Sequence, residues 1–169
     1  MGTRLEHSRG VAHAARRLAP VVGNHADLLE ASGWLHDIGY APDLATTGFH
    51  PLDGARHLRA LPLGDPLLWE LVARHTQAHV EAGRRGLLGE LDREFPGRLT
   101  SERLLACLTY ADMVTGPDGT RVTPESRITE ILNRYDAGSV VHDSIKEAAP
   151  ALLGMCSRVE TWSATSAAS

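Results

Sequence analysis

Prolines and helix-capping side chains divide this chain into short segments. Asp65 stands directly before Pro66, and Thr123 stands directly before Pro124. A capping side chain followed by proline is typical of the start of a helix, because the first turn needs no backbone N–H from proline. Between such boundaries apolar residues recur at helical spacing, and no long run alternates apolar with polar side chains. The sequence therefore predicts an all-α fold, a single-domain helical bundle.

The expected helices lie between these boundary residues. They cover residues 4–19, 24–35, 52–61, 66–75, 78–93 in shorter pieces, 102–114, 125–135 and, as one or two helices, 140–159. Pro20 should stop the first helix. Asn24 and Thr100 are expected to cap two of the others, and Gly39 should allow a left-handed exit from the second.

The composition fits one folded unit. A chain of 169 residues that is 43% hydrophobic and 22% charged can bury a single core without cross-links. We expect the domain to span residues 1–162, and the Ser, Ala and Thr residues of 163–169 to form a disordered tail. Cys107 and Cys156 lack the spacing of a disulfide framework or metal site and should be buried thiols.

The charge pattern argues against some partners. The net charge is −4 and no long run of Lys or Arg occurs, so we do not expect binding to duplex nucleic acid. No stretch approaches 18 uninterrupted apolar residues and the N-terminus does not resemble a secretory signal, so we expect no membrane contact and a cytoplasmic location. The Leu- and Ala-rich terminal helices could form a homodimer or complete the monomer's own core.

Helical register sorts the nine histidines into inward-facing and outward-facing groups. His7 and His75 share helical faces with apolar neighbours and should point into the core. Asp112 falls on the most apolar face of the chain, where a carboxylate needs a cation, a metal or several hydrogen-bond donors. The adjacent His36 and Asp37, at an expected helix end, could face one cation together.

Each of these residues has a simpler explanation when taken alone. A single inward histidine is more often a hydrogen-bonded core residue than a metal ligand, and Asp112 could be a cap or an ion-pair partner. Their coincidence with the His-Asp pair in one small core favours a metal site.

The order of His7, His36 with Asp37, and Asp112 resembles the H…HD…D signature of the HD superfamily of metal-dependent phosphohydrolases. HDIG at residues 36–39 resembles the HDIG subset of that superfamily. HSRGVAHAARRLA and LLACLTYADMVTG resemble the helices that carry its first and last ligands. The resemblance covers about residues 4–116. It implies that these residues hold a metal ion and that His36 and Asp37 are catalytic.

Members of that superfamily with two metals have further histidines between the HD pair and the last aspartate. The resemblance implies His50 and His75 as these ligands, with Asp37 between the two ions. His79 follows His75 by four positions and ranks below His50. The remaining histidines, His13, His25, His57 and His142, are not expected to be ligands.

The chain also differs from the proteins that it resembles. Tyr40 replaces the lysine that follows HDIG in many members. Thr76 follows His75 where the cyclic-dinucleotide phosphodiesterases have a second histidine, and their glycine-tyrosine-proline signature is missing. The Glu and Asp that follow the HD motif in guanosine tetraphosphate hydrolases are also missing. These two substrate classes are therefore less expected.

Histidine and carboxylate ligands suit one or two divalent ions and do not distinguish Mn, Fe, Ni, Mg and Zn. Such ions can activate water to attack phosphorus without a protein nucleophile. The resemblance thus implies hydrolysis of a phosphate ester of a nucleotide or another small phosphorylated metabolite. Two alternatives stay open, a di-iron oxygenase of the same fold and a non-catalytic ligand-binding sensor.

Contacts to the substrate are less constrained by the sequence. The candidates are Tyr40, Arg74, Arg121 and Arg127, since arginine is suited to bind phosphate. The segment TGPDGTRV, residues 115–122, could approach a ligand or be an ordinary turn.

Overall fold

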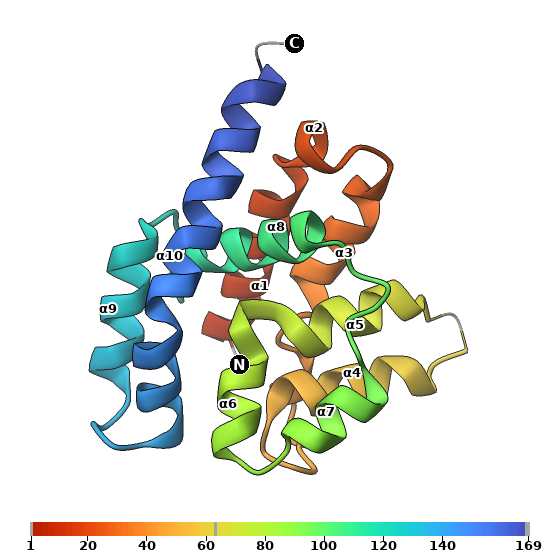
Figure 1. Ribbon diagram of the computed structural model, residues 1–169, viewed down its shortest axis with the longest axis vertical. Coiled ribbons are helices and arrows are strands. Elements are labelled where there is room, and N and C mark those ends of the chain that lie inside the picture. Colours follow the sequence, from red (N-terminus) through yellow and green to blue (C-terminus); the bar gives the residue numbers. More distant parts are fainter. Residues whose placement is uncertain (1, 63, 168–169) are drawn as a thin grey trace.

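The computed structural model describes residues 2–62 and 64–167, and within them the fold is all-helical as predicted (Figure 1). The α-helices are α1 (Gly2–Arg16), α2 (Ala19–Val22), α3 (Ala26–Leu35), α4 (His50–Ala60), α5 (Pro66–Arg74), α6 (Ala78–Arg84), α7 (Leu88–Glu94), α8 (Glu102–Met113), α9 (Pro124–Arg134) and α10 (Val140–Ala167). Short 3-10 helices lie at η1 (Gly23–His25), η2 (Ile38–Tyr40) and η3 (His75–Gln77). Extended pairing in these residues is confined to an isolated bridge between Thr115 and Arg121.

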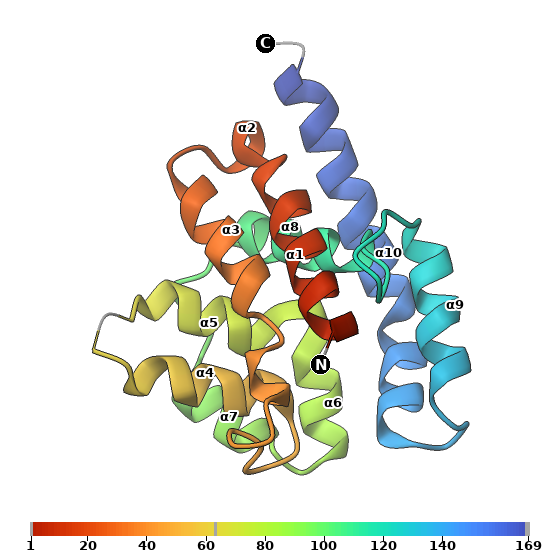
Figure 2. The ribbon, with the colours of Figure 1, turned by 180° about the vertical axis from the view of Figure 1, so that it is seen from behind.

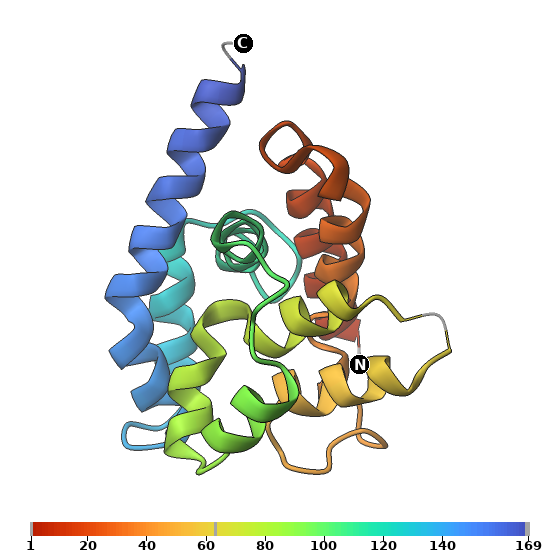
Figure 3. The same cartoon turned by 45° about the vertical axis from the view of Figure 1, so that its right-hand side comes forward.

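Helix α8 runs through the middle of the molecule. Figure 3 views it almost along its axis, with α1 and α3 on one side and α10 on the other. Its inward face joins a core that includes Val11 of α1, Leu29 of α3 and Val159 of α10. Because α1 and α8 pack together, their polar side chains at the same level are brought side by side.

Two of the expected caps are confirmed and two are wrong. Asp65 accepts a hydrogen bond from the N–H of Leu67, and Thr123 from that of Ser126. Ser101, not Thr100, caps α8. Glu70 accepts the backbone N–H groups of residues 97–100 and so turns the chain one residue further before the helix begins. Asn24 lies inside η1, and α3 starts without a side-chain cap.

Pro20 begins a helix instead of ending the first one as we expected, and Pro150 does not interrupt the last helix. The first helix ends at Arg16, and Pro20 lies in the first turn of α2, where its missing N–H costs nothing. Pro150 lies inside α10, which is one continuous helix.

The prediction of a disordered tail is wrong for residues 163–167. Helix α10 continues through Ala167 and projects from the body of the molecule (Figure 1). Trp162 packs against the core and under the guanidinium of Arg103, 4.8 Å from its ring centre, which anchors the helix just before this segment. Residues 168 and 169 of the predicted tail lie outside the described residues.

Gly39 does not make the left-handed exit that we expected, because its φ is not positive and it lies within η2. A Cβ at this position would overlap the carbonyl oxygen of His50 and lie 2.6 Å from the backbone nitrogen of Gly54. The glycine is therefore needed for the close approach of α4 to the HDIG segment.

Both cysteines are buried thiols, as predicted. In the part of the chain that the structure describes, no helix combines the length and hydropathy required to cross a bilayer.

Candidate metal centre

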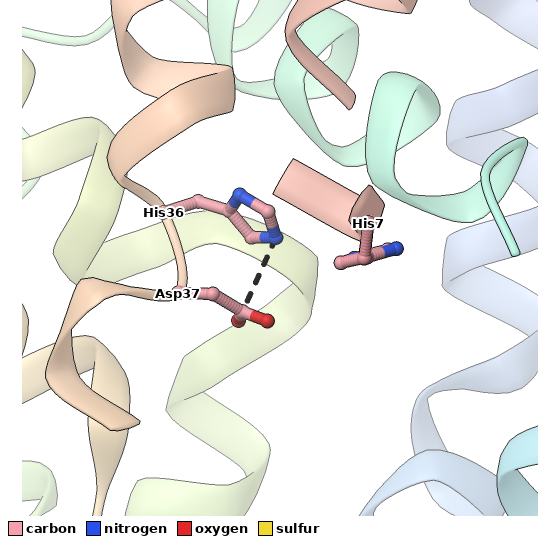
Figure 4. A group of neighbouring side chains, drawn as sticks. All are labelled: His7, His36 and Asp37. Atoms are coloured by element: carbon pink, nitrogen blue, oxygen red, sulfur yellow. Dashed lines mark ion pairs between the residues drawn. The ribbon is translucent and has the colours of Figure 1, made fainter. Parts of the chain in front are cut away.

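Five of the six predicted metal ligands line one cavity, and the sixth, His36, is buried directly beside them, although the six come from different helices. His7 lies on α1, His36 and Asp37 follow α3, His50 begins α4, His75 follows α5, and Asp112 lies near the end of α8. The ring centre of His36 lies 5.3 Å from that of His7 and 5.2 Å from that of His75. Figure 4 shows His7 beside His36 and Asp37, with the ion pair between His36 and Asp37 marked by a dashed line.

Three of these histidines are held in the same way. Each places Nδ1 within hydrogen-bond distance of a backbone carbonyl, His7 with Gly116 at 3.0 Å, His36 with Gly33 at 2.8 Å and His75 with Val72 at 2.7 Å. A carbonyl oxygen can only accept, so Nδ1 must carry the proton and donate it. This arrangement orients each ring and leaves Nε2 of His36 and His75 as an acceptor that could bind a metal, whereas Nε2 of His7 faces Asp112.

Nε2 of His36 is the atom that points most clearly to a metal site. The side chain is fully buried, and this nitrogen has no hydrogen-bond partner among the described residues. An unpaired buried polar atom costs about 1–3 kcal/mol. A metal ion at this position would use the free electron pair, so the residues present fit a metal.

Asp37 belongs to two potential ligand sets. His7, His36 and Asp37 form one, and Asp37, His50 and His75 form the other, with ligand atoms within 4.8 Å of one another in each set. Oδ1 of Asp37 lies 3.5 Å from Nε2 of His36 and 3.3 Å from Nε2 of His50. One carboxylate between two groups of imidazoles could bridge two divalent cations.

Asp112 contacts the centre through His7. Its Oδ1 lies 3.1 Å from Nε2 of His7, and its Oδ2 accepts a hydrogen bond of 2.7 Å from the hydroxyl of Thr76. Burial alone would raise the pKa of Asp112, but His7 and the charges of His36 and Arg127 outweigh it and hold that pKa well below its usual value. We expected a buried carboxylate at Asp112 to need several partners, and His7, Thr76 and Arg127 are those partners.

Burial and the neighbouring charges also set the protonation of the other ligands. Burial lowers the pKa of His50 to about 3 and lowers that of His75. Burial opposes ionisation of Asp37, but His36 and His50 reduce its pKa to about 2. In contrast, Asp112 raises the pKa of His7 despite burial. His50, His75 and Asp37 are thus in the forms that bind metal, whereas the raised pKa of His7 favours its imidazolium form, from which a metal ion would displace a proton.

The lowered pKa of His50 predicts a loss of stability in acid for the metal-free protein. Its folded pKa lies below its unfolded pKa of 6.5, so the unfolded state binds more protons, and the stabilisation present above pH 6.5 is lost as the pH falls toward 3. Between pH 7.5 and 5 we expect this residue to remove about 2 kcal/mol from the free energy of unfolding.

Urea unfolding of the chelator-treated protein at the two pH values measures this effect. His50→Gln is the matched variant, and its stability should fall less over the same interval by about that amount. Equal pH dependence in the two proteins would contradict the assignment to His50.

Arg4 is a site residue that the sequence analysis missed. Its Nη1 lies 3.1 Å from Oδ2 of Asp37, and its guanidinium carbon lies 3.6 Å from the ring centre of Tyr40. Tyr40 in turn stacks on His50 with ring centres 4.0 Å apart. Arg4 thus supplies a positive charge that Tyr40 cannot. Its position one helical turn before His7 was the available signal, because residues three apart share a helix face.

The space inside the cavity that water-sized molecules can reach is about 100 Å³. Of the predicted substrate contacts, Tyr40 and Arg127 line it. Arg74 instead donates to the carbonyl of Phe95 at 2.7 Å and to Asp92 at 2.8 Å, so it ties α5 to the segment around α7. Arg121 is exposed beside Thr115 on the loop, and neither arginine is among the described cavity-lining residues.

The TGPDGTRV loop acts on the site through α1. A Cβ on Gly119 would overlap the carbonyl oxygen of Glu6, so this glycine permits close packing against α1 rather than against a ligand. The same loop supplies the Gly116 carbonyl that orients His7.

The backbone after His75 separates it from His79. Thr76 and Gln77 have positive φ angles of 51° and 58°, which are unfavourable for residues other than glycine and interrupt the helix. His79 is exposed beyond this break, as are His13 and His25. His57 is half-buried on α4, and His142 is half-buried and pairs with Asp143.

Comparisons with known proteins agree with this geometry. The family model described as HD domain matches residues 4–138. Ribonuclease Y from Rhodopirellula baltica is 36% identical over 77 residues, which make up 46% of this chain and only 15% of that protein. No solved structure matches the chain.

Proposed function

The chain belongs to the HD-domain family, and on that premise we propose that it is a metal-dependent hydrolase of phosphate esters, acting on a nucleotide or another small phosphorylated metabolite. The observation that carries the proposal is Asp37 shared by two histidine sets, with Nε2 of His36 buried and without a hydrogen-bond partner among the described residues. Such a centre suits hydrolysis, because it needs no protein nucleophile.

His7, His36 and Asp37 would hold one ion, and Asp37, His50 and His75 would hold a second. Bound ions would supply an activated water and positive charge beside the phosphoryl oxygens. Mn, Fe, Ni, Mg and Zn all suit these ligands. Asp112 and Thr76 keep His7 in place, and Tyr40 covers one face of His50.

Arginines complete the phosphate site. Arg4, Arg127 and Arg134 line the cavity near the metal ligands. Arg127 is buried, its Nη2 lies 3.8 Å from Oδ1 of Asp112, and its Nε has no hydrogen-bond partner among the described residues. Although Nη1 of Arg127 is paired with Glu130, the guanidinium retains donors that a phosphoryl oxygen could accept.

Replacing Arg127 with alanine is expected to raise KM for the phosphate ester by roughly tenfold to a hundredfold, because a charged hydrogen bond to phosphate is lost. Steady-state kinetics measures the change, and metal content per chain should stay the same. Arg121→Ala is the matched control, since Arg121 is exposed and lies on the loop. Equal effects in both variants would remove Arg127 from the proposed phosphate site.

The test of the function is a turnover assay in the absence of oxygen. The protein is stripped with a chelator, reloaded with Mn or Fe, and incubated with a panel of nucleotides and phosphorylated metabolites while phosphate release is measured. Turnover that needs metal and persists without oxygen supports the hydrolase. Activity that requires oxygen would establish the oxygenase alternative, and bound metal without any turnover would favour the sensor.

A further inference from the structure

The cavity does not end at the metal ligands. It is also lined by Ile131 and Tyr135 from α9 and its following turn, and by Val141, Ile145 and Ala148 from α10. Figure 2 shows the α9–α10 hairpin facing α6 and the start of α1, the side on which Arg4 and His7 lie. One continuous cavity therefore has a charged end and an apolar wall.

This apolar wall is accessible from inside the cavity. Val141 and Ile145 are only half-buried, although Ile145 also packs against the buried cluster that contains Ala148, whereas Ile131 and Ala148 are buried. Apolar surface facing water is stabilised when an apolar ligand covers it. The wall is thus suited to an organic group attached to a phosphate held at the other end.

Polar side chains on the same side already have partners within the protein. The hydroxyl of Ser144 donates to the carbonyl of Val140 at 2.6 Å, and Glu81 accepts from Arg85 at 2.7 Å. Nε2 of Gln77 lies 2.8 Å from the sulfur of Met155. Because these groups are already hydrogen-bonded, they are poorly placed to bind the hydroxyls of a polyol. The apolar surface beside them is better suited to a hydrocarbon chain or a ring.

We infer that the α9–α10 wall is a specificity subsite for the alcohol part of the substrate, and that the substrate class is phosphate esters of apolar or ring-bearing alcohols. This inference rests on the proposed function, because the phosphate must be held at the metal end. Val141, Ile145 and Ala148 lie beyond residues 4–138, so this part of the wall is outside the segment that the family model matches.

Alkylphosphonates test the subsite because they keep the phosphorus group constant and cannot be hydrolysed. Titration calorimetry of the Mn-loaded protein with methyl-, butyl- and hexylphosphonate gives the affinity as a function of chain length. We expect the affinity to rise by about threefold to fourfold for each methylene that reaches the wall. The Val141→Asn and Ile145→Asn variants should bind methylphosphonate as the unmodified protein does but lose most of the rise.

Val140→Asn is the matched control, since Val140 is the neighbouring residue on α10, is 36% exposed and is not among the described lining residues. Circular dichroism checks folding, and Val141→Asn, at a half-buried position, is the milder variant if Ile145→Asn fails to fold. Methylphosphonate binding without any gain from longer chains would overturn the subsite and leave the proposed function standing. Metal-loaded protein that binds none of the phosphonates would overturn both. Equal effects of Val140→Asn and Val141→Asn would overturn the assignment to this wall.

Discussion

Replacing Asp37 with alanine is expected to empty the metal centre and to lower kcat/KM for phosphate-ester hydrolysis by at least about a thousandfold. Asp37 belongs to both ligand sets, so its loss takes a carboxylate from each proposed ion. The substitution also removes the negative charge that lies beside the guanidinium of Arg4 and the imidazoles of His36 and His50. No other single substitution among the predicted ligands removes a group from both sets.

Metal analysis of the purified variant, together with phosphate release under the conditions that support turnover of the unmodified protein, measures the two effects. Asp43→Ala is the matched control, because Asp43 is an exposed aspartate in the loop that follows the same segment. It should keep both metal and activity. An Asp37→Ala protein with an undiminished metal content would show that the histidines hold the ions without the shared carboxylate.

Replacing Gly39 with alanine is expected to destabilise the fold by about 3 kcal/mol or more, which is at the upper end for a single methyl group. The added Cβ would overlap the His50 carbonyl oxygen and crowd the Gly54 nitrogen. Both obstacles belong to the backbone of α4 and cannot move by a change of rotamer. The helix itself would have to shift, and His50 would shift with it.

Chemical denaturation measures the loss of stability, and metal analysis measures the displacement of His50. Gly89→Ala is the matched control, because Gly89 lies in α7 and a Cβ there would have no heavy atom within 4 Å. Alanine at that position should be neutral or stabilise by about 0.5–1 kcal/mol. If Gly39→Ala were as stable as Gly89→Ala, the close approach would not be the reason for glycine in the HDIG segment.

The elements that the sequence predicted correctly depend on short-range interactions. Asp65 and Thr123 cap helices two or three residues away, and this geometry is set almost entirely by the local backbone. The inward direction of His7, His75 and Asp112 followed from helical register with their immediate neighbours. These inferences needed no knowledge of which helices pack together.

The errors arose where a distant segment decided the outcome. Thr100 lost the capping position to Ser101 because Glu70, thirty positions earlier in the chain, binds the preceding backbone. The helix expected to end near residue 159 continues because Trp162 packs against the core. Arg74 has a charge suited to phosphate, but its guanidinium donates hydrogen bonds to Phe95 and Asp92 in the segment around α7. The close contact at Gly39 exists only once α4 is docked.

The sequence by itself determined the helical class of the fold, most helix starts and which polar side chains face inward, because periodicity and capping act over one or two turns. The resemblance already implied that Asp37 lies between two groups of histidines. Only the tertiary structure decided that Arg4 reaches Asp37 and that α9 and α10 line the cavity with an apolar wall. Those relations depend on the packing of helices that are far apart in the chain. Such packing is fixed by the shape of the whole core and not by any local run of residues.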